Sequence, residues 1–206
     1  LDGSAEKASA LLTDAHASGR GLAALFDEVL CPAMRRVGDL WHEGELTVAQ
    51  EHVATRAALS ALQTLGGALA EAEPFAPLAV CCGAEDDFHE LPVNCSELVL
   101  HEGGWAVLNL GANTPFYALA EAVARRGPRL VAVAATVLAD LDRAVSEFKD
   151  LRAAAARAGA AVVLGGAGFA DAAVRRRLPA DLHADSFMQL SELSEKKKNE
   201  VMRTED

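Results

Sequence analysis

The feature that most restricts the fold is a regular alternation of short apolar runs and helical segments after residue 77. The apolar runs lie at 78–82, 106–110, 130–135 and 161–164, the helical segments at 89–102, 115–127 and 140–158, and a last short strand is expected near 182–184. Apolar runs of this length predict strands buried on both faces, and strands separated by helices predict a parallel sheet. We therefore predict an α/β fold, with a doubly wound, flavodoxin-like sheet over residues 76–186.

Residues 1–73 have a different pattern, which predicts helices throughout. Leu22, Leu25, Phe26 and Val29 recur at the three-and-four spacing of one helical face. Gly44 interrupts this pattern, and the sequence from Thr47 to Gln50 is typical of a capping box that opens a helix over about 48–71. Helices of this length joined by short turns predict a small N-terminal bundle, followed by a linker at 73–77.

The last segment, residues 187–206, is polar and predicts a C-terminal helix. Leu190, Leu193, Lys197 and Val201 fall roughly on one side of that helix. Two interpretations are open. The segment is either a solvated terminal helix or a linker and signalling helix that leads into a further domain.

Charge and composition exclude several classes of partner. The formal net charge is −11, from 19 basic and 30 acidic side chains. This balance argues against a general nucleic-acid surface, which needs a basic stripe. No apolar run has the length of a membrane span and no export signal is visible, so we expect a cytoplasmic protein. Its four cysteines are expected to be reduced and mostly buried: Cys31, Cys81, Cys82 and Cys95.

Ligands of doubly wound sheets bind at the loops that follow the strands. Here these loops are 83–89, 111–115, 136–138 and 165–168, and none carries a dinucleotide fingerprint or a phosphate-binding lysine. His89 in the first loop has two interpretations. It is either an ordinary histidine at the head of a helix or a metal ligand whose ring is oriented by Asp87.

Three of these loops together resemble the cobalamin-binding domain of methionine synthase, corrinoid methyltransferase carriers and adenosylcobalamin mutases. The matching segments are Asp87-Phe88-His89, Thr136-Val137-Leu138 and Gly165-Gly166. The resemblance implies that His89 binds cobalt from below and that Asp87 orients its ring. It also implies that Thr136, Leu138, Gly165 and Gly166 border the displaced tail of the cofactor. Pro92 stands where that family has glycine, which puts the path of the tail in doubt but not the ligand.

A second resemblance lies in "GDLWHEGELTVAQEHVAT", residues 38–55. Trp41, nine further residues and then Glu51-His52 are similar to the helical cap of light-sensing cobalamin regulators of the CarH type. The similarity extends over about residues 8–186. It implies that Trp41 packs against the 5′-deoxyadenosyl group, that Glu51 hydrogen-bonds the adenosyl ribose and that His52 borders the same pocket. It further implies that His42 takes the upper cobalt position after light breaks the cobalt–carbon bond.

These resemblances imply a light-sensing, adenosylcobalamin-binding regulatory domain rather than an enzyme. Photolysis would change the packing of the bundle against the sheet domain and control an output domain of the same parent chain, such as a GGDEF diguanylate cyclase. Related photocobilins also bind a bilin, so biliverdin is a further expected chromophore, with Cys95 and His101 as candidate contacts. We expect a homo-oligomer, most simply a dimer. The alternatives are a corrinoid methyl-carrier subunit and a haem-binding sensor of the same fold.

Overall fold

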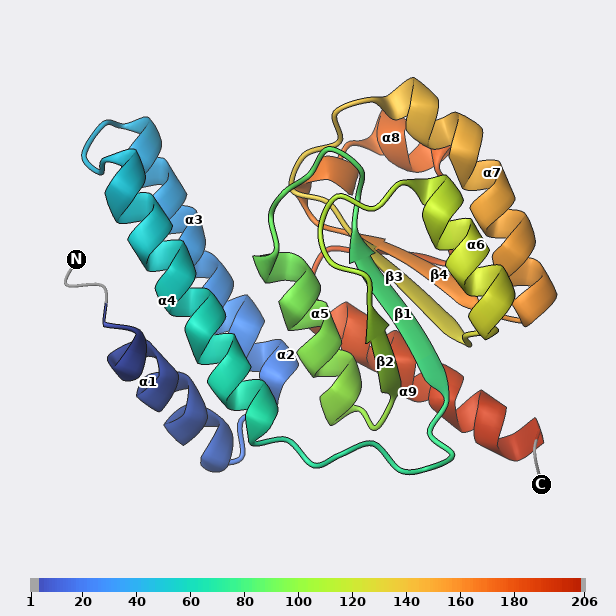
Figure 1. Ribbon diagram of the computed structural model, residues 1–206, viewed down its shortest axis with the longest axis horizontal. Coiled ribbons are helices and arrows are strands. Elements are labelled where there is room, and N and C mark those ends of the chain that lie inside the picture. The colour runs from blue at the N-terminus through green and yellow to red at the C-terminus, as the bar shows by residue number, and fades with distance from the viewer. Residues whose placement is uncertain (1–3, 205–206) are drawn as a thin grey trace. The chain divides into compact units, whose positions relative to one another are not determined.

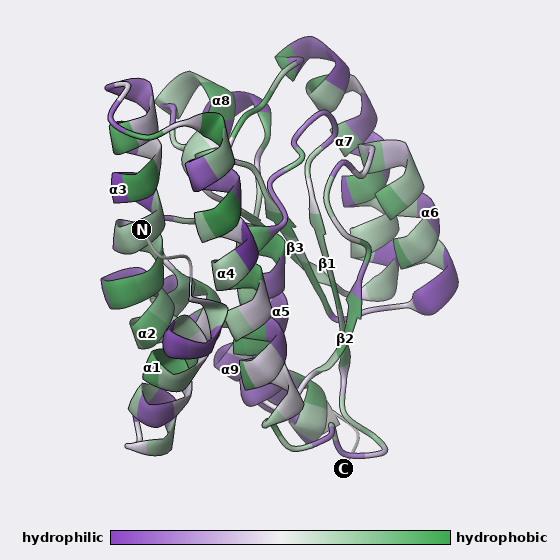
Figure 2. Ribbon diagram, turned by 60° about the vertical axis from the view of Figure 1, so that its left-hand side comes forward, coloured by the Kyte–Doolittle hydropathy of each residue, from purple (hydrophilic) through white to green (hydrophobic). Residues whose placement is uncertain are grey.

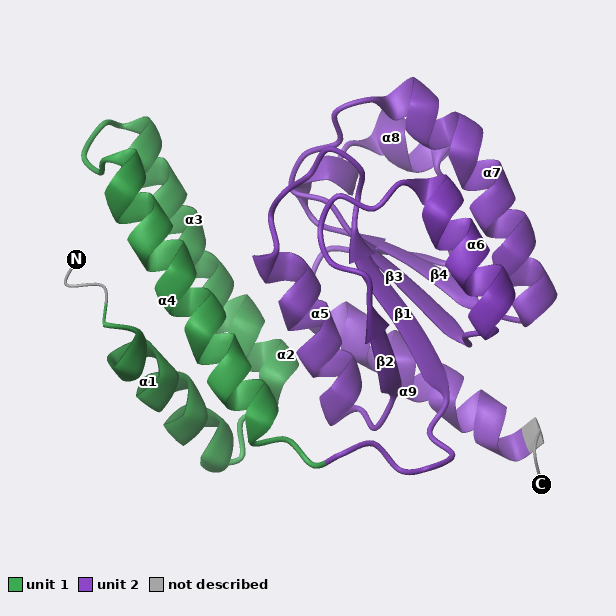
Figure 3. Ribbon diagram, viewed as in Figure 1, with its two compact units in different colours: residues 1–70 green, residues 71–206 purple. Residues whose placement is uncertain are grey.

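The computed structural model describes residues 4–204 and divides the chain into two compact units. The first unit is residues 1–70 and the second is residues 71–206 (Figure 3). Over the described residues, no helix combines the length and the apolar character needed to cross a bilayer.

The first unit is helical throughout, as predicted. Its elements are α1 (Ala5–Ala17), α2 (Leu22–Leu25), η1 (Phe26–Leu30), α3 (Cys31–His42) and α4 (Val48–Gly67). The segment η1 is one π-helical stretch, at whose end the Cys31 amide donates to the Phe26 carbonyl. Pro32 follows at the start of α3 and has no N–H to donate, so a locally altered hydrogen-bond pattern is expected here. The chain therefore passes from α2 into α3 through a π turn.

The core of the first unit lies at one end of the bundle. Its buried side chains come from α1, α2, η1 and the second half of α4: Leu12, Leu22, Leu25, Phe26, Leu62 and Leu65. At the other end, α3 has no buried residue among those described, and Trp41, Val48 and Val53 are exposed. The capping box predicted at Thr47 and Gln50 is confirmed, and α4 ends at Gly67 rather than near 71.

The second unit is a five-stranded, wholly parallel sheet in the order β2-β1-β3-β4-β5. The strands are β1 (Leu78–Gly83), β2 (Ala106–Asn109), β3 (Leu130–Ala134), β4 (Ala161–Gly165) and β5 (Leu182–Ala184). Helices α5 (Leu91–Glu102) and α9 (Phe187–Thr204) cover one face, and α6 (Phe116–Arg126) and α7 (Leu141–Ala158) cover the other (Figure 1). The predicted fold class is confirmed.

Successive side chains of a strand point to opposite faces of the sheet, so each strand contributes to two apolar layers. Val80 and Cys82 belong to the hydrophobic core under α6 and α7, whereas Cys81, one residue between them, is buried but outside that cluster. Burial raises the pKa of the Cys82 thiol and outweighs a hydrogen bond with Thr114 that lowers it, so the pKa is about 12. The amphipathic helices show both ends of the hydropathy scale in Figure 2, with their green faces turned to this core. Cys81, Cys82 and Cys95 are thus buried, as expected, while Cys31 is partly exposed.

The C-terminal helix α9 belongs to the second unit rather than standing apart. It packs on α5, with Leu190 and Ser194 buried, and the Lys198 ammonium donates a 2.8 Å hydrogen bond to the Gly103 carbonyl. The polarity of residues 187–206 predicts a segment apart from the sheet domain, but that polarity belongs only to the outward face of α9. Two short elements had no prediction: η2 (Ala167–Phe169) and α8 (Ala172–Arg177), which Asp171 caps. Both are too short to show a periodicity.

Candidate functional site

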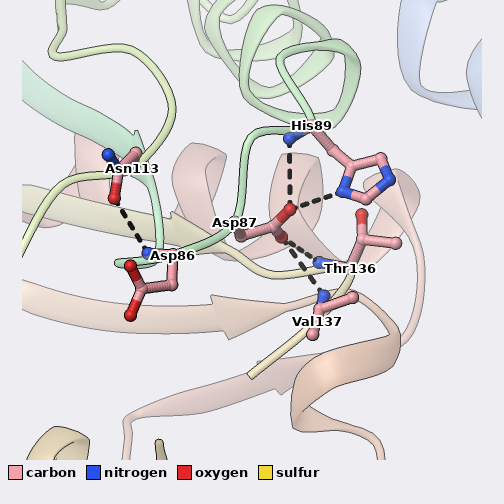
Figure 4. A network of polar contacts seen from close by, with 6 residues as sticks. All are labelled: Asp86, Asp87, His89, Asn113, Thr136 and Val137. Carbon is pink, nitrogen blue, oxygen red and sulfur yellow. Dashed lines mark hydrogen bonds and ion pairs between the residues drawn. The ribbon is translucent and has the colours of Figure 1, made fainter. Parts of the chain in front are cut away.

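The site begins in the loop between β1 and α5, at the carboxyl edge of the sheet. Neighbouring β1 and β3 carry their connections to opposite faces, so the loops that follow them diverge, and ligands of open parallel sheets bind at such a point. Asp87 and His89 lie in the first of these loops and Thr136 in the second. The structure brings all three together (Figure 4).

Asp87 is a buried carboxylate whose two oxygens are both hydrogen-bonded. Only 3 % of the residue is exposed. Oδ1 accepts from the His89 amide at 3.1 Å, and Oδ2 accepts from the amides of Thr136 at 2.5 Å and Val137 at 3.3 Å. Burial by itself would raise the pKa of this carboxyl. The hydrogen bonds from the His89 ring and amide, then from Thr136 and Val137, outweigh that effect and lower the pKa. Asp87 is therefore a charged acceptor at neutral pH.

The ring of His89 is anchored through one nitrogen only. Its Nδ1 lies 2.5 Å from Asp87 Oδ1, and an ionised carboxylate cannot donate, so Nδ1 carries the proton in this contact. The neutral imidazole then keeps its lone pair on Nε2, which lies on the side of the ring away from Asp87 (Figure 4). The side chain is 56 % exposed. A carboxylate on one nitrogen and an accessible lone pair on the other is the arrangement of a metal-binding histidine, so these residues fit a cobalt ligand.

Pro92 does not disturb the loop of residues 84–90 that carries His89 (the ligand loop). It occupies the first turn of α5, where an amide would have no partner within the helix, and Ser96 Oγ donates to the Pro92 carbonyl at 2.9 Å. The helix makes its first regular bond from the Asn94 amide to the Glu90 carbonyl. The helix expected to start at residue 89 starts at Leu91, so His89 lies in the loop.

The loops after β3 and β4 pack tightly against each other. Gly166 has a left-handed φ of +100°, and a Cβ there would lie 2.4 Å from the Ala135 carbonyl oxygen. A Cβ on Gly165 would lie 3.5 Å from the Ala184 carbonyl oxygen, which is an ordinary contact. Leu138, on the loop after β3, packs partly on the core under α6 and α7. Gly166 thus lets its own backbone approach that of Ala135 closely, while Leu138 anchors the loop after β3 to the hydrophobic core.

The predicted residues of the first unit cluster where α3 ends and α4 begins. The rings of Trp41 and His42 have their centres 4.6 Å apart, and both side chains are exposed. Glu51 accepts a 2.7 Å hydrogen bond from Thr55 Oγ1 and lies 3.6 Å from His52 Nε2. His52 also lines a shallow groove between α1 and α4 with Ala5, Val53, Arg56 and Ala57. The four predicted residues share one end of the bundle.

Sequence reasoning missed two residues that hold the ligand loop. Asn113, in the loop after β2, accepts from the Asp86 amide at 2.8 Å and donates from its own amide to the Asp87 carbonyl at 2.9 Å. Arg143 of α7 pairs with Glu85 at 2.9 Å and Asp86 at 2.5 Å. The one available signal for Asn113 was its residue type in a strand-end loop, because asparagine tolerates left-handed backbone. Arg143 gave no signal.

Comparisons with known proteins agree with this fold. Residues 1–65 match the family model described as the B12 binding domain. The chain is 32 % identical over 131 residues to the HTH-type transcriptional repressor CarH of Myxococcus xanthus, over 61 % of this chain and 40 % of that relative. The chain thus spans about two-fifths of the length of the curated relative it matches.

Solved structures share the fold at low identity. A monomethylamine corrinoid protein of Methanosarcina barkeri aligns over 90 % of this chain and 88 % of its own, with a TM-score of 0.73 and 21 % identity. A cobalamin-binding protein of Desulfitobacterium hafniense DCB-2 aligns over 95 % and 93 %, with a TM-score of 0.52 and 20 % identity.

The chain thus combines a helical bundle whose residues 1–65 match the B12 binding domain model with a flavodoxin-like sheet that carries an anchored histidine. The chain is similar in sequence to CarH and shares the fold of the monomethylamine corrinoid protein.

Proposed function

We propose that this chain is a light-sensing regulatory domain that binds adenosylcobalamin. The observation that carries the cobalamin part is the Asp87–His89 contact of 2.5 Å beside an accessible Nε2. The light-sensing part is supported by the CarH relationship and by the clustering of Trp41, His42, Glu51 and His52 at one end of the bundle. When bound, adenosylcobalamin supplies a cobalt–carbon bond that visible light breaks.

His89 would hold the cobalt, and Asp87 would increase the basicity of its ring. The carboxylate is held by two amides of the loop after β3, so the ring has a defined orientation before any ligand arrives. Thr136 and Gly165-Gly166 would border the cofactor tail at the same edge of the sheet.

The residues near the turn between α3 and α4 would recognise the 5′-deoxyadenosyl group of the cofactor. Trp41 is 40 % exposed although it belongs to an amphipathic helix, so its ring is available to pack against an adenine. Glu51 has Oε1 engaged by Thr55, which holds the carboxylate in place to accept from ribose hydroxyls. His42 is exposed beside Trp41 and would be available to bind cobalt in the absence of the adenosyl group.

The output of such a sensor would lie elsewhere in the parent chain. A dark-state and a light-state ligand with different affinities for two packings of the units would shift the equilibrium between them. We expect a dimer whose state depends on light and an attached output such as a diguanylate cyclase. We also propose biliverdin as a second chromophore. Cys95 offers it no accessible thiol, because this residue is fully buried in α5.

The test is to load the protein with adenosylcobalamin and record absorption and size before and after green light. We expect binding in the dark, a spectral change on illumination and a change in oligomeric state. His89→Ala should weaken binding at least about tenfold, since even outer partners of metal ligands are worth that much. His16→Ala, in the last turn of α1, is the matched control. Unchanged binding and spectrum in His89→Ala would refute the ligand.

The upper cluster is tested separately. Trp41→Ala should reduce affinity for adenosylcobalamin more than for methylcobalamin, because only the former has the group that the ring would contact. Leu11→Ala removes another exposed apolar side chain from the bundle and is the control. Equal loss for both cofactors, or a Soret band with haem in place of cobalamin binding, would favour the methyl carrier or the haem sensor.

A further inference from the structure

Two residues other than glycine have left-handed backbone within residues 4–204: Asp86, with φ of 62°, and Asn113, with φ of 52°. Such conformations cost free energy and persist where surrounding contacts impose them, often at functional sites. Here both occur in adjacent loops at the carboxyl edge of the sheet. Their coincidence requires an explanation beyond the turn chemistry of either loop.

The two residues hold each other's loops through reciprocal contacts. The Asp86 amide donates to Asn113 Oδ1 at 2.8 Å, and the Asn113 amide donates to the Asp87 carbonyl at 2.9 Å. Asn113 thus binds the Asp86–Asp87 segment through both an amide and a carbonyl of its backbone. The loops also extend the strand pairing, because the Thr114 amide donates to the Gly83 carbonyl at 2.9 Å.

The same segment positions the metal-ligand ring. The backbone of Asp87 is held by Asn113, its carboxylate by Thr136 and Val137, and the ring of His89 by that carboxylate (Figure 4). Arg143 adds ion pairs to Glu85 and Asp86, but the side chains of Arg143 and Asp86 are 39 % and 48 % exposed, so water screens their attraction. Asn113 also lies at the surface, but it holds the backbone of this segment through two neutral hydrogen bonds rather than through screened charges.

We propose that Asn113 is a positioning residue that sets the orientation of His89 through the Asp86–Asp87 backbone. This inference rests on the proposed role of His89 as the cobalt ligand. The amide side chain supplies the acceptor for Asp86, and the left-handed backbone aims the Asn113 N–H at the Asp87 carbonyl. A residue that keeps both properties should support the ligand, and one that loses the acceptor should not.

The experiment uses cob(II)alamin bound to protein labelled with ¹⁵N-histidine and reads the hyperfine pattern from the axial nitrogen. Asn113→Gly adopts the same φ but has no acceptor. We expect a smaller fraction of histidine-bound cobalt and about tenfold weaker binding of cob(II)alamin, as for other outer supports of metal ligands. Asn113→Asp keeps an oxygen acceptor and should retain the wild-type pattern. Asn199→Gly, exposed on α9, controls for a general loss of stability.

The outcomes separate this inference from the proposed function. A wild-type protein without a histidine hyperfine pattern would refute the ligand itself. If the wild type shows it and Asn113→Gly keeps both pattern and affinity, or if Asn113→Asp loses them equally, the positioning role is overturned. Hydrogen exchange of the Asp86 amide in the cofactor-free wild type is a second measurement that needs no variant. Protection is expected, and exchange as fast as in an open loop would contradict the bond.

Discussion

At the scale of single residues, Asp87 shows how a buried charge is made stable and useful at once. A carboxylate removed from water is costly unless its oxygens are hydrogen-bonded. Asp87 meets this condition with three backbone amides and the ring of His89. An asparagine would present an NH₂ group to some of these donors, so the network selects an acid. The same bonds that stabilise the charge orient the imidazole.

Replacing this residue should cost measurable stability. Asp87→Ala leaves buried donors without an acceptor, and we expect the free energy of unfolding to fall by about 2–3 kcal/mol at neutral pH. Urea unfolding of the cofactor-free protein measures this. Asp150→Ala, an exposed acid on α7, should change little. Equal effects of the two substitutions would show that the network contributes nothing specific.

The same carboxylate predicts how stability depends on pH. Its pKa in the folded chain lies below the ordinary value of 3.8, so in acid the unfolded chain binds the proton more readily. The stabilisation is complete above the unfolded pKa and is lost as pH falls through the lower, folded pKa. Wild type should therefore lose stability below about pH 4 more steeply than Asp87→Ala. Parallel pH profiles in that range would contradict this.

At the scale of elements, the junction of β4 with η2 depends on one glycine. Gly166→Ala would impose a left-handed φ on a residue with a side chain and place its Cβ 2.4 Å from a carbonyl oxygen. We expect a loss of at least about 2 kcal/mol, since the backbone penalty by itself is about 1–2 kcal/mol. Gly165→Ala, one residue earlier, makes only a 3.5 Å contact and should stay within about 1 kcal/mol of wild type. Thermal unfolding of both variants compares them, and a tolerated Gly166→Ala would mean that the loop relaxes.

At the scale of the whole molecule, α5 links the ligand loop to the helix that ends the described chain. His89 lies two residues before its start, and the Gly103 carbonyl just after its last residue accepts from Lys198 of α9. A Cβ at Gly104 would lie 2.3 Å from the Lys198 ammonium, so this turn leaves space for the contact. We predict that a displacement of His89 reaches α9 through α5, in part by way of this hydrogen bond.

Lys198→Met should weaken that link. In protein loaded with adenosylcobalamin, we expect light to change hydrogen exchange in α9 and the variant to reduce this difference. Lys197→Met removes the neighbouring cation, which pairs with Glu200 on the helix itself, and should leave the difference intact. A light-dependent change that survives Lys198→Met and Lys197→Met alike would exclude this route.

The order and type of the main elements were predictable because they depend on local patterns. Buried strands such as 78–83 and the capping box at Thr47 are visible in short windows of sequence. The resemblance to cobalamin-binding domains also selected Asp87 and His89, which the structure joins. The role of residues 187–204 was less predictable, since their polar surface says nothing about the Leu190 and Ser194 side buried on the second unit.

By itself, the sequence determined the alternation of strands and helices, the helical bundle before it and the acid–histidine pair in the first strand-end loop. Only the tertiary structure decided which distant residues support that pair. Thr136 and Asn113 reach Asp87 from loops that follow different strands, and Arg143 reaches the same loop from α7. The physical reason is that these contacts depend on strand order: β1 lies between β2 and β3, and no local periodicity encodes that neighbourhood.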